Sequence, residues 1–122
     1  MGNLFQKEKI TVRFPKELRL AMLQSIVNDG YGLHGKSKWA MEAIQEFLKL
    51  NQFVDFVDIG SEAGNGELTE TESFNFPITI VEELEKAVLK VREKYPTIEG
   101  IRSIIIRSSV LQKLLRNPRQ VT

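Results

Sequence analysis

The sequence predicts a small, mainly α-helical domain with a two-stranded antiparallel β-ribbon, and three observations point to it. Two short segments, residues 9–14 and 73–80, alternate polar and apolar residues as half-buried strands do. Each is followed by two segments whose apolar residues recur at three- and four-residue spacing, which is typical of amphipathic helices. A lone strand leaves its edge unpaired and its apolar face open. We therefore expect the two sets to pair their strands antiparallel and to interlock four helices beneath them.

The first set of elements begins with the strand at residues 9–14. Pro15 follows it and suits the first turn of a helix, where a missing N–H removes no hydrogen bond. An apolar stripe then predicts a helix over residues 16–29, and Gly30 is expected to end it in the left-handed conformation. A second helix is predicted over residues 36–48.

The second set repeats this order. A strand over residues 73–80 contains Pro77, which departs from the pattern because proline cannot donate a hydrogen bond to a neighbouring strand. Helices are predicted from about residue 82 and from about residue 98 to residue 116. Shifting the chain by 66 residues places the apolar residues of the first strand on those of the second. We therefore expect a single domain over residues 1–122, made of a first copy, an acidic linker and a second copy at residues 7–54, 55–72 and 73–117.

Charge is distributed in blocks along the chain. Residues 1–50 carry a net charge of +3, residues 51–72 carry −6 with no basic residue, and residues 73–122 carry +4, for a total of +1. Two basic halves joined by an acidic segment indicate a polyanionic partner more strongly than the total charge does. Ordinary surface charge is the alternative explanation.

Composition excludes several kinds of chemistry. The chain has no cysteine, which rules out disulfides, thiolate zinc sites and a cysteine nucleophile. The single histidine, His34, provides neither a metal cluster nor a base for a catalytic triad. No apolar run approaches the roughly 18 residues that a membrane span needs. We therefore expect a cytoplasmic binding protein without cofactor, metal or membrane partner, and not an enzyme.

Residues 30–37, Gly-Tyr-Gly-Leu-His-Gly-Lys-Ser, match the phosphate-loop expression G-x-x-x-x-G-K-[ST]. The expression has meaning after a buried strand of a parallel sheet, whereas an amphipathic helix is predicted to precede it here. Free N–H groups at the start of a helix nevertheless attract phosphate. Ser37 is a helix cap, a phosphate contact, or both.

Residues 9–47 and again 73–115 resemble the ribbon-helix-helix family of DNA-binding proteins, to which the Arc and MetJ repressors belong. Most members carry one copy and form dimers. Two copies in one chain are similar to the tandem members, such as the TraY-type relaxosome accessory proteins of conjugative plasmids. The resemblance covers about 80 of the 122 residues and rests on pattern. It implies an internally duplicated ribbon-helix-helix pseudo-dimer whose ribbon enters the major groove of DNA.

The resemblance also implies two groups of contact residues. Outward side chains of the ribbon would read base edges, namely Lys9, Thr11, Arg13, Asn75 and Thr79. The second helix of each copy would begin against the DNA backbone, with phosphate contacts from Lys36, Ser37, Lys38 and Thr97. The first strand is basic and the second is neutral, so we expect a non-palindromic site that is read mainly by the first strand.

The sequence therefore favours sequence-specific binding of double-stranded DNA. The protein would act as a transcriptional repressor or as an accessory factor in plasmid or phage DNA processing, and pseudo-dimers could self-associate on the DNA. The alternative is an antitoxin-like or assembly protein that mainly binds another protein. Residues 51–59 bear on this choice because their secondary structure is ambiguous. Four of their apolar side chains would either cap the core or form an exposed apolar patch for self-association or for a partner protein, namely Phe53, Val54, Phe56 and Val57.

Overall fold

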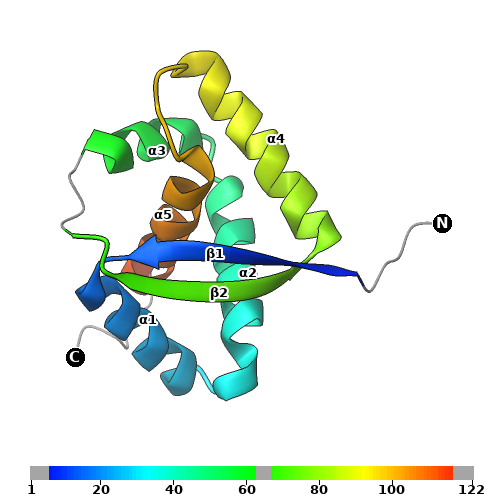
Figure 1. The fold of residues 1–122 in the computed structure, drawn as a ribbon, viewed down its shortest axis with the longest axis vertical. Helices are drawn as coiled ribbons and strands as arrows, with labels where there is room; N and C mark the ends of the chain where they lie inside the picture. Colours follow the sequence, from blue (N-terminus) through cyan, green and yellow to red (C-terminus); the bar gives the residue numbers. More distant parts are fainter. Residues whose placement is uncertain (1–5, 63–66, 117–122) are drawn as a thin grey trace.

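The computed structural model describes residues 6–62 and 67–116 of the chain. Within them it has five α-helices, one short 3₁₀ turn and a two-stranded antiparallel sheet (Figure 1). In chain order the elements are β1 (Lys7–Phe14), α1 (Lys16–Asn28), η1 (Leu33–Gly35), α2 (Lys36–Leu48), α3 (Phe53–Glu62), β2 (Glu70–Pro77), α4 (Ile78–Lys94) and α5 (Ile101–Arg116). The predicted fold class, mainly helical with a two-stranded antiparallel sheet, is confirmed.

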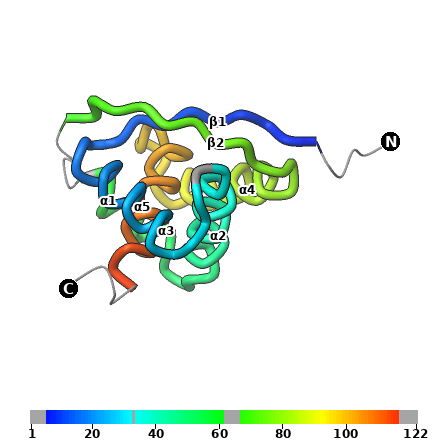
Figure 2. Tube along the Cα trace, turned by 90° about the horizontal axis from the view of Figure 1, so that it is seen from below, coloured from blue at the N-terminus to red at the C-terminus, as the bar shows by residue number. Residues whose placement is uncertain are grey.

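The ribbon forms one layer and the helices form the other. β1 and β2 pair along their whole length, with Thr11 opposite Ser73 at the centre. All the helices lie on one side of the ribbon, and no described element covers its other face (Figure 2). α1 leaves from one end of the ribbon and α4 from the other, while α2 and α5 lie behind its middle (Figure 1).

The core fills the space between the ribbon and the helices. From the strands, Phe14, Phe74 and Phe76 are fully buried. The rings of Phe14 and Phe74 meet edge to face with their centroids 6.3 Å apart, an arrangement that aromatic pairs favour. From the helices, Trp39 of α2 and Ile105 of α5 are also completely buried. Because these residues come from both halves of the chain, neither half can bury its apolar face without the other.

The second strand lies earlier in the chain than the alternation predicted. β2 spans Glu70–Pro77, so the prediction of a strand over residues 73–80 was wrong at its carboxyl end, and α4 begins at Ile78 rather than near residue 82. Pro77, with φ −56° and ψ 150°, is the residue that precedes α4, as Pro15 precedes α1. Apolar residues at positions 78 and 80 fit the first turn of a helix as well as a strand, so alternation could not separate the two.

The segment predicted to be a linker, residues 55–72, contains most of α3 and the first residues of β2. Phe53 and Val57 of α3 are buried, and α3 packs against α4 and α5. The ring of Phe53 also meets the ring of Phe47 in α2 edge to face, with centroids 6.1 Å apart. Phe53 and Val57 therefore cap the core, and they are not available as a patch for a partner.

An acidic residue of the same segment ties α3 to the end of α4. Asp55 Oδ1 accepts hydrogen bonds from Lys94 Nζ at 2.8 Å and from the Tyr95 hydroxyl at 2.6 Å. The bonds from Lys94 and Tyr95 hold the pKa of the Asp55 carboxyl below its usual value. At least one carboxylate of the acidic segment, residues 51–72, is thus engaged in holding two helices together.

Two glycines mark helix boundaries. Gly30 has φ 81°, which confirms the prediction that it follows α1 in the left-handed conformation. Gly100 has φ 65° and stands directly before α5, which starts at Ile101 rather than near residue 98. A right-handed helix needs a negative φ, so α5 cannot extend back through this position. Residues other than glycine rarely adopt the positive angle.

Glu72 is the polar exception among the buried residues of β2, the others being Phe74 and Phe76. Its side chain is 8% exposed, where a carboxylate without partners would be costly. Arg19 of α1 donates from Nε to Glu72 Oε2 at 2.5 Å, and Lys36 of α2 donates from Nζ to Oε1 at 2.6 Å. Burial by itself would raise the pKa of the Glu72 carboxyl, but the hydrogen bonds from Lys36 and Arg19 outweigh it and lower the pKa. The triad joins α1 and α2 to β2.

We expect Glu72→Gln to destabilise the protein by about 1–3 kcal/mol at neutral pH, because it leaves two cations facing a neutral amide. The folded-state pKa is lowered, so the stabilisation is complete above the ordinary glutamate pKa of 4.5 and is lost as the pH falls through the folded-state pKa. Urea unfolding at successively lower pH should show the difference between wild type and variant shrinking. Glu70→Gln is the matched control, since Glu70 lies 3.6 Å from Arg19. An equal loss of stability in both variants would contradict the role of Glu72.

Candidate nucleic-acid interface

The ribbon separates charges between its two faces. Odd-numbered side chains of both strands point away from the helices and even-numbered ones toward them, as burial at positions 10, 12 and 14 and at 72, 74 and 76 indicates. Glu8 shares the even parity but is exposed, because it lies near the end of the ribbon. Every basic residue of the two strands falls on the outer face and every acidic residue on the inner face. The bases are Lys7, Lys9 and Arg13, and the acids are Glu8, Glu70 and Glu72. The outer face therefore carries positive charge without a carboxylate from either strand.

Hydrogen-bonding side chains lie between these charges. Thr11 Oγ1 and Ser73 Oγ are 2.8 Å apart across the centre of the ribbon. Asn75 is exposed and lies opposite Lys9. Eight residues per strand, at about 3.3 Å each, give a strip roughly 25 Å long. The strip offers a hydroxyl pair, an amide and three cations to whatever lies against it.

Within the described part of the chain, the cations of the outer face have no acidic partner. No ion pair within residues 6–62 and 67–116 involves Lys7, Lys9 or Arg13. By contrast, bases on the helical side include several that are paired, as Lys94 is with Asp55 at 2.8 Å. A solvated cation that is unpaired in the free protein can neutralise a phosphate without first breaking another contact.

Four of the five residues predicted to read bases share this face, namely Lys9, Thr11, Arg13 and Asn75. The fifth, Thr79, was placed wrongly. It is exposed, but it lies in the first turn of α4 and not on the ribbon, because the strand ends at Pro77.

Two outer-face residues, Lys7 and Thr71, lay outside the predicted strands, and Ser73 lay within one but was not among the residues predicted to read bases. The alternation in fact continues through residues 69–73, which read Thr-Glu-Thr-Glu-Ser. Acids occupy the inward positions there, so the segment has the composition of a linker. The period-two alternation that predicts a strand was therefore present, but it was not recognised because the inward residues are acidic and not apolar.

The start of α2 lies beside the free edge of β2. The Asn75 N–H donates to Ser37 Oγ at 2.9 Å. Lys36 is engaged with Glu72, so its charge is already neutralised within the protein. Of the three residues predicted to contact phosphate at this point, Lys38 is the one whose cation is exposed and forms no ion pair with another described residue.

α5 lies beside the other edge of the ribbon. Arg107 Nη1 donates to the carbonyl oxygen of Arg13 at 3.0 Å. Thr97, predicted to match the start of α2, is exposed in the segment before α5 and not in its first turn. That first turn carries Arg102, an exposed basic residue. It was not predicted as a phosphate contact because the helix was predicted to start near residue 98.

The phosphate-loop match at residues 30–37 follows helix α1 and not a strand, so the setting that the motif requires is missing. Gly35 has a packing explanation, because a Cβ there would lie 2.5 Å from the Cβ of Tyr31. The Tyr31 hydroxyl donates a hydrogen bond to Glu42, which raises the pKa of Tyr31 to about 12. The segment is thus built for the turn between α1 and α2.

In the part of the chain that the structure describes, no group of three or more His, Asp or Glu side chains could hold a metal ion. No helix there is long and apolar enough to cross a membrane. Comparisons of the chain with protein-family models, with curated proteins and with solved structures find no match. Function must therefore be inferred from the outer face of the ribbon and its surroundings.

We expect Ser37→Ala to speed hydrogen exchange of the Asn75 amide by about tenfold, because the variant removes the acceptor that holds this edge N–H. Exchange followed by NMR measures the effect directly. Lys38→Ala, a change at the neighbouring exposed position, should leave the rate unchanged. Identical rates in wild type and Ser37→Ala would mean that α2 does not hold the edge of β2.

Proposed function

We propose that the protein binds double-stranded DNA in a sequence-specific manner, with the β1–β2 ribbon in the major groove and the helices facing away. The observation that carries the proposal is the uncovered outer face of the ribbon. Basic side chains that form no ion pair with a described residue alternate there with a hydroxyl along β1, opposite hydroxyl and amide side chains of β2. The major groove, about 12 Å wide, admits a two-stranded ribbon. The role we infer is that of a transcriptional repressor or of an accessory factor in plasmid or phage DNA processing.

An approximate two-fold relation within the ribbon supports a single-chain ribbon-helix-helix pseudo-dimer. Both strands are closed by Phe-Pro, at residues 14–15 and 76–77, an offset of 62 residues. The same offset takes Thr11 to Ser73, which is also its partner in the register. A residue that faces its own counterpart lies on a two-fold axis, as at the centre of a symmetric dimer. This offset of 62 replaces the 66 that the apolar alternation suggested.

The two halves of the ribbon would read different bases. Lys9 and Arg13 suit O6 and N7 of guanine, and Thr11 suits either a polar base edge or a thymine methyl. The counterpart of Arg13 at the same offset is Asn75, which suits N6 and N7 of adenine. Because counterparts differ, we infer a non-palindromic site in which β1 supplies most of the discrimination.

The helices that flank the ribbon would contact the DNA backbone. Lys38 and Arg102 are exposed in the first turns of α2 and α5, the two helices that reach opposite edges of the ribbon through Ser37 and Arg107. Cations and free N–H groups at helix starts both favour phosphate. Contacts of this kind set the position of the ribbon in the groove without reading sequence.

The protein-binding alternative relied on residues 53–57, and the fold uses half of that patch internally. Phe53 and Val57 are 6% and 0% exposed, and Val54 and Phe56 are half-buried. No observation at this segment favours a partner protein over DNA.

Selection of bound sequences from a random duplex library tests the proposal. We expect one enriched, non-palindromic motif. If about six phosphates are neutralised, log K should fall with a slope near −5 per log unit of salt. Weak, salt-sensitive binding without an enriched motif would contradict sequence readout. No binding even at low salt would contradict DNA binding altogether.

Arg13→Ala should weaken binding to the selected site by about 5- to 150-fold, corresponding to about 1–3 kcal/mol, and relax one base position. Lys38→Ala should instead weaken binding to all sequences alike and reduce the salt slope by about one unit. Lys90→Ala is the matched control, because it removes an exposed charge from α4. Affinities measured on cognate and scrambled duplexes separate these cases. Unchanged cognate binding in Arg13→Ala would end the ribbon-readout hypothesis.

A further inference from the structure

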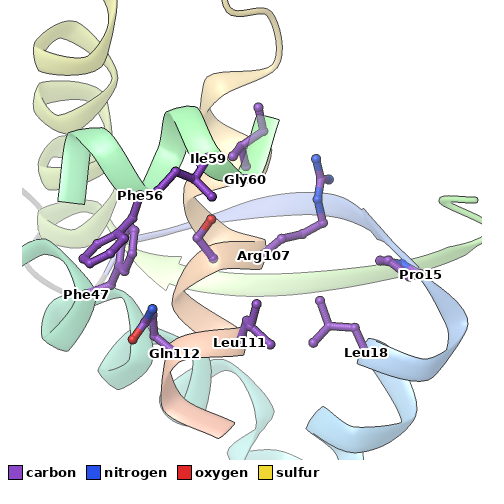
Figure 3. A pocket seen from close by; sticks show the side chains of 11 residues that line it. Pro15, Leu18, Phe47, Phe56, Ile59, Gly60, Arg107, Leu111 and Gln112 are labelled. Carbon is purple, nitrogen blue, oxygen red and sulfur yellow. The ribbon is translucent and has the colours of Figure 1, made fainter. Parts of the chain in front are cut away.

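A pocket lies on the helical side of the molecule, among α1, α2, α3 and α5 (Figure 3). Its volume is about 300 Å³, at the lower end of the range for small-molecule sites. Its walls are mostly apolar and include Leu18 of α1, Phe47 of α2 and Phe56 of α3. Two further lining residues, Ile59 and Leu111, are 61% and 46% exposed. Apolar surface at this pocket is therefore left in contact with water.

Arg107 of α5 is the one charged side chain among the described residues that line this pocket, hereafter the Arg107 pocket. Its Nη1 donates to the carbonyl oxygen of Arg13 at 3.0 Å, but its Nε is buried and has no hydrogen-bond partner. Burial lowers the pKa of the Arg107 guanidinium. Among the described residues no carboxylate lines the pocket to compensate this half-buried charge. An anion in the pocket would provide that compensation.

A single cation among apolar walls favours one class of ligand, an anion with an apolar body. A carboxylate is the anion whose planar geometry matches a guanidinium. An apolar body attached to it would cover the exposed wall residues. A phosphate would bring a second charge and further oxygens against walls that offer few hydrogen bonds. A protein partner would need a larger surface than a cavity of this size provides.

We propose that the Arg107 pocket binds a small carboxylate with an apolar body, of the kind of a medium-chain fatty acid, and that its occupation weakens DNA binding. The second part rests on the proposed function. Arg107 holds the backbone of Arg13, whose side chain lies on the outer face of the ribbon. A carboxylate that pairs with the guanidinium neutralises a positive charge beside the ribbon. Loss of this charge opposes the attraction of phosphates.

Octanoate is the probe, and 1-octanol is its uncharged counterpart. Calorimetry on the full chain should give octanoate a Kd of about 0.1–1 mM, which a ligand of this size can reach. Octanol should bind at least about tenfold more weakly, because it cannot form the charged pair. Chemical-shift changes in NMR spectra with octanoate should centre on Ile59, Ser108 and Leu111.

Variants separate the charge from the cavity. Arg107→Gln should weaken octanoate binding about tenfold and leave octanol unaffected, while Arg107→Lys should restore part of the loss. Ser108→Leu fills the pocket from α5 without removing the cation, and should abolish binding of both probes. Arg92→Gln, an exposed change on α4, is the matched control. Melting curves accompany each variant, and Ser108→Leu decides the matter if Arg107→Gln fails to fold.

Three results would overturn the site. The first is octanol binding as tightly as octanoate, and the second is shift changes scattered away from the pocket. The third is a dimer in sedimentation experiments that Ser108→Leu dissociates, which would make a second copy of the chain the occupant.

DNA affinity provides the test of coupling. Saturating octanoate should weaken binding to the selected duplex about fivefold in wild type and not in Ser108→Leu, and the duplex should weaken octanoate binding by the same factor. Octanoate bound in the pocket with unchanged DNA affinity would overturn the coupling. If no duplex binds, the proposed function fails, and calorimetry still decides whether the pocket exists.

Discussion

The pairing of β1 with β2 is the contact on which the rest of the structure depends. In the described chain, each strand pairs only with the other. Nearly half of the sequence separates the end of β1 from the start of β2. Bringing such distant segments together is entropically costly, and burial of the aromatic inward face offsets it. Phe14 on β1 and Phe74 on β2 pack against each other, above helices contributed by both halves. The two strand-and-helix sets therefore form one cooperative unit.

A two-stranded ribbon has two free edges, and the helices occupy both. Ser37 of α2 accepts the edge N–H of Asn75, while Arg107 of α5 donates to the edge carbonyl of Arg13. These contacts oppose pairing with another strand, the usual hazard of an exposed edge. They also connect the outer face of the ribbon to the helical layer.

One glutamate of the acidic segment, residues 51–72, has a structural role inside the ribbon. Glu72 occupies the inward position that Ile10 occupies in β1, at the offset of 62 residues that relates the strands. It is tolerated because Arg19 and Lys36 meet it from two helices. This arrangement engages Lys36 and leaves the exposed bases of β1 as the free positive charge of the ribbon. The ribbon is thus asymmetric inside as well as outside.

The amino-acid sequence by itself determined the fold class, the strand before Pro15, the end of α1 at Gly30 and four of the side chains on the outer face. Period-two alternation and helical spacing are local properties, and they can be read wherever apolar residues mark the inward positions. Only the tertiary structure decided that β2 begins in the acidic segment, that α3 belongs to the core, and that Lys36 is neutralised by Glu72. Each of these depends on a partner far away in the chain. A buried carboxylate and a linker carboxylate look alike in sequence until the cations that pair with one of them are brought into place.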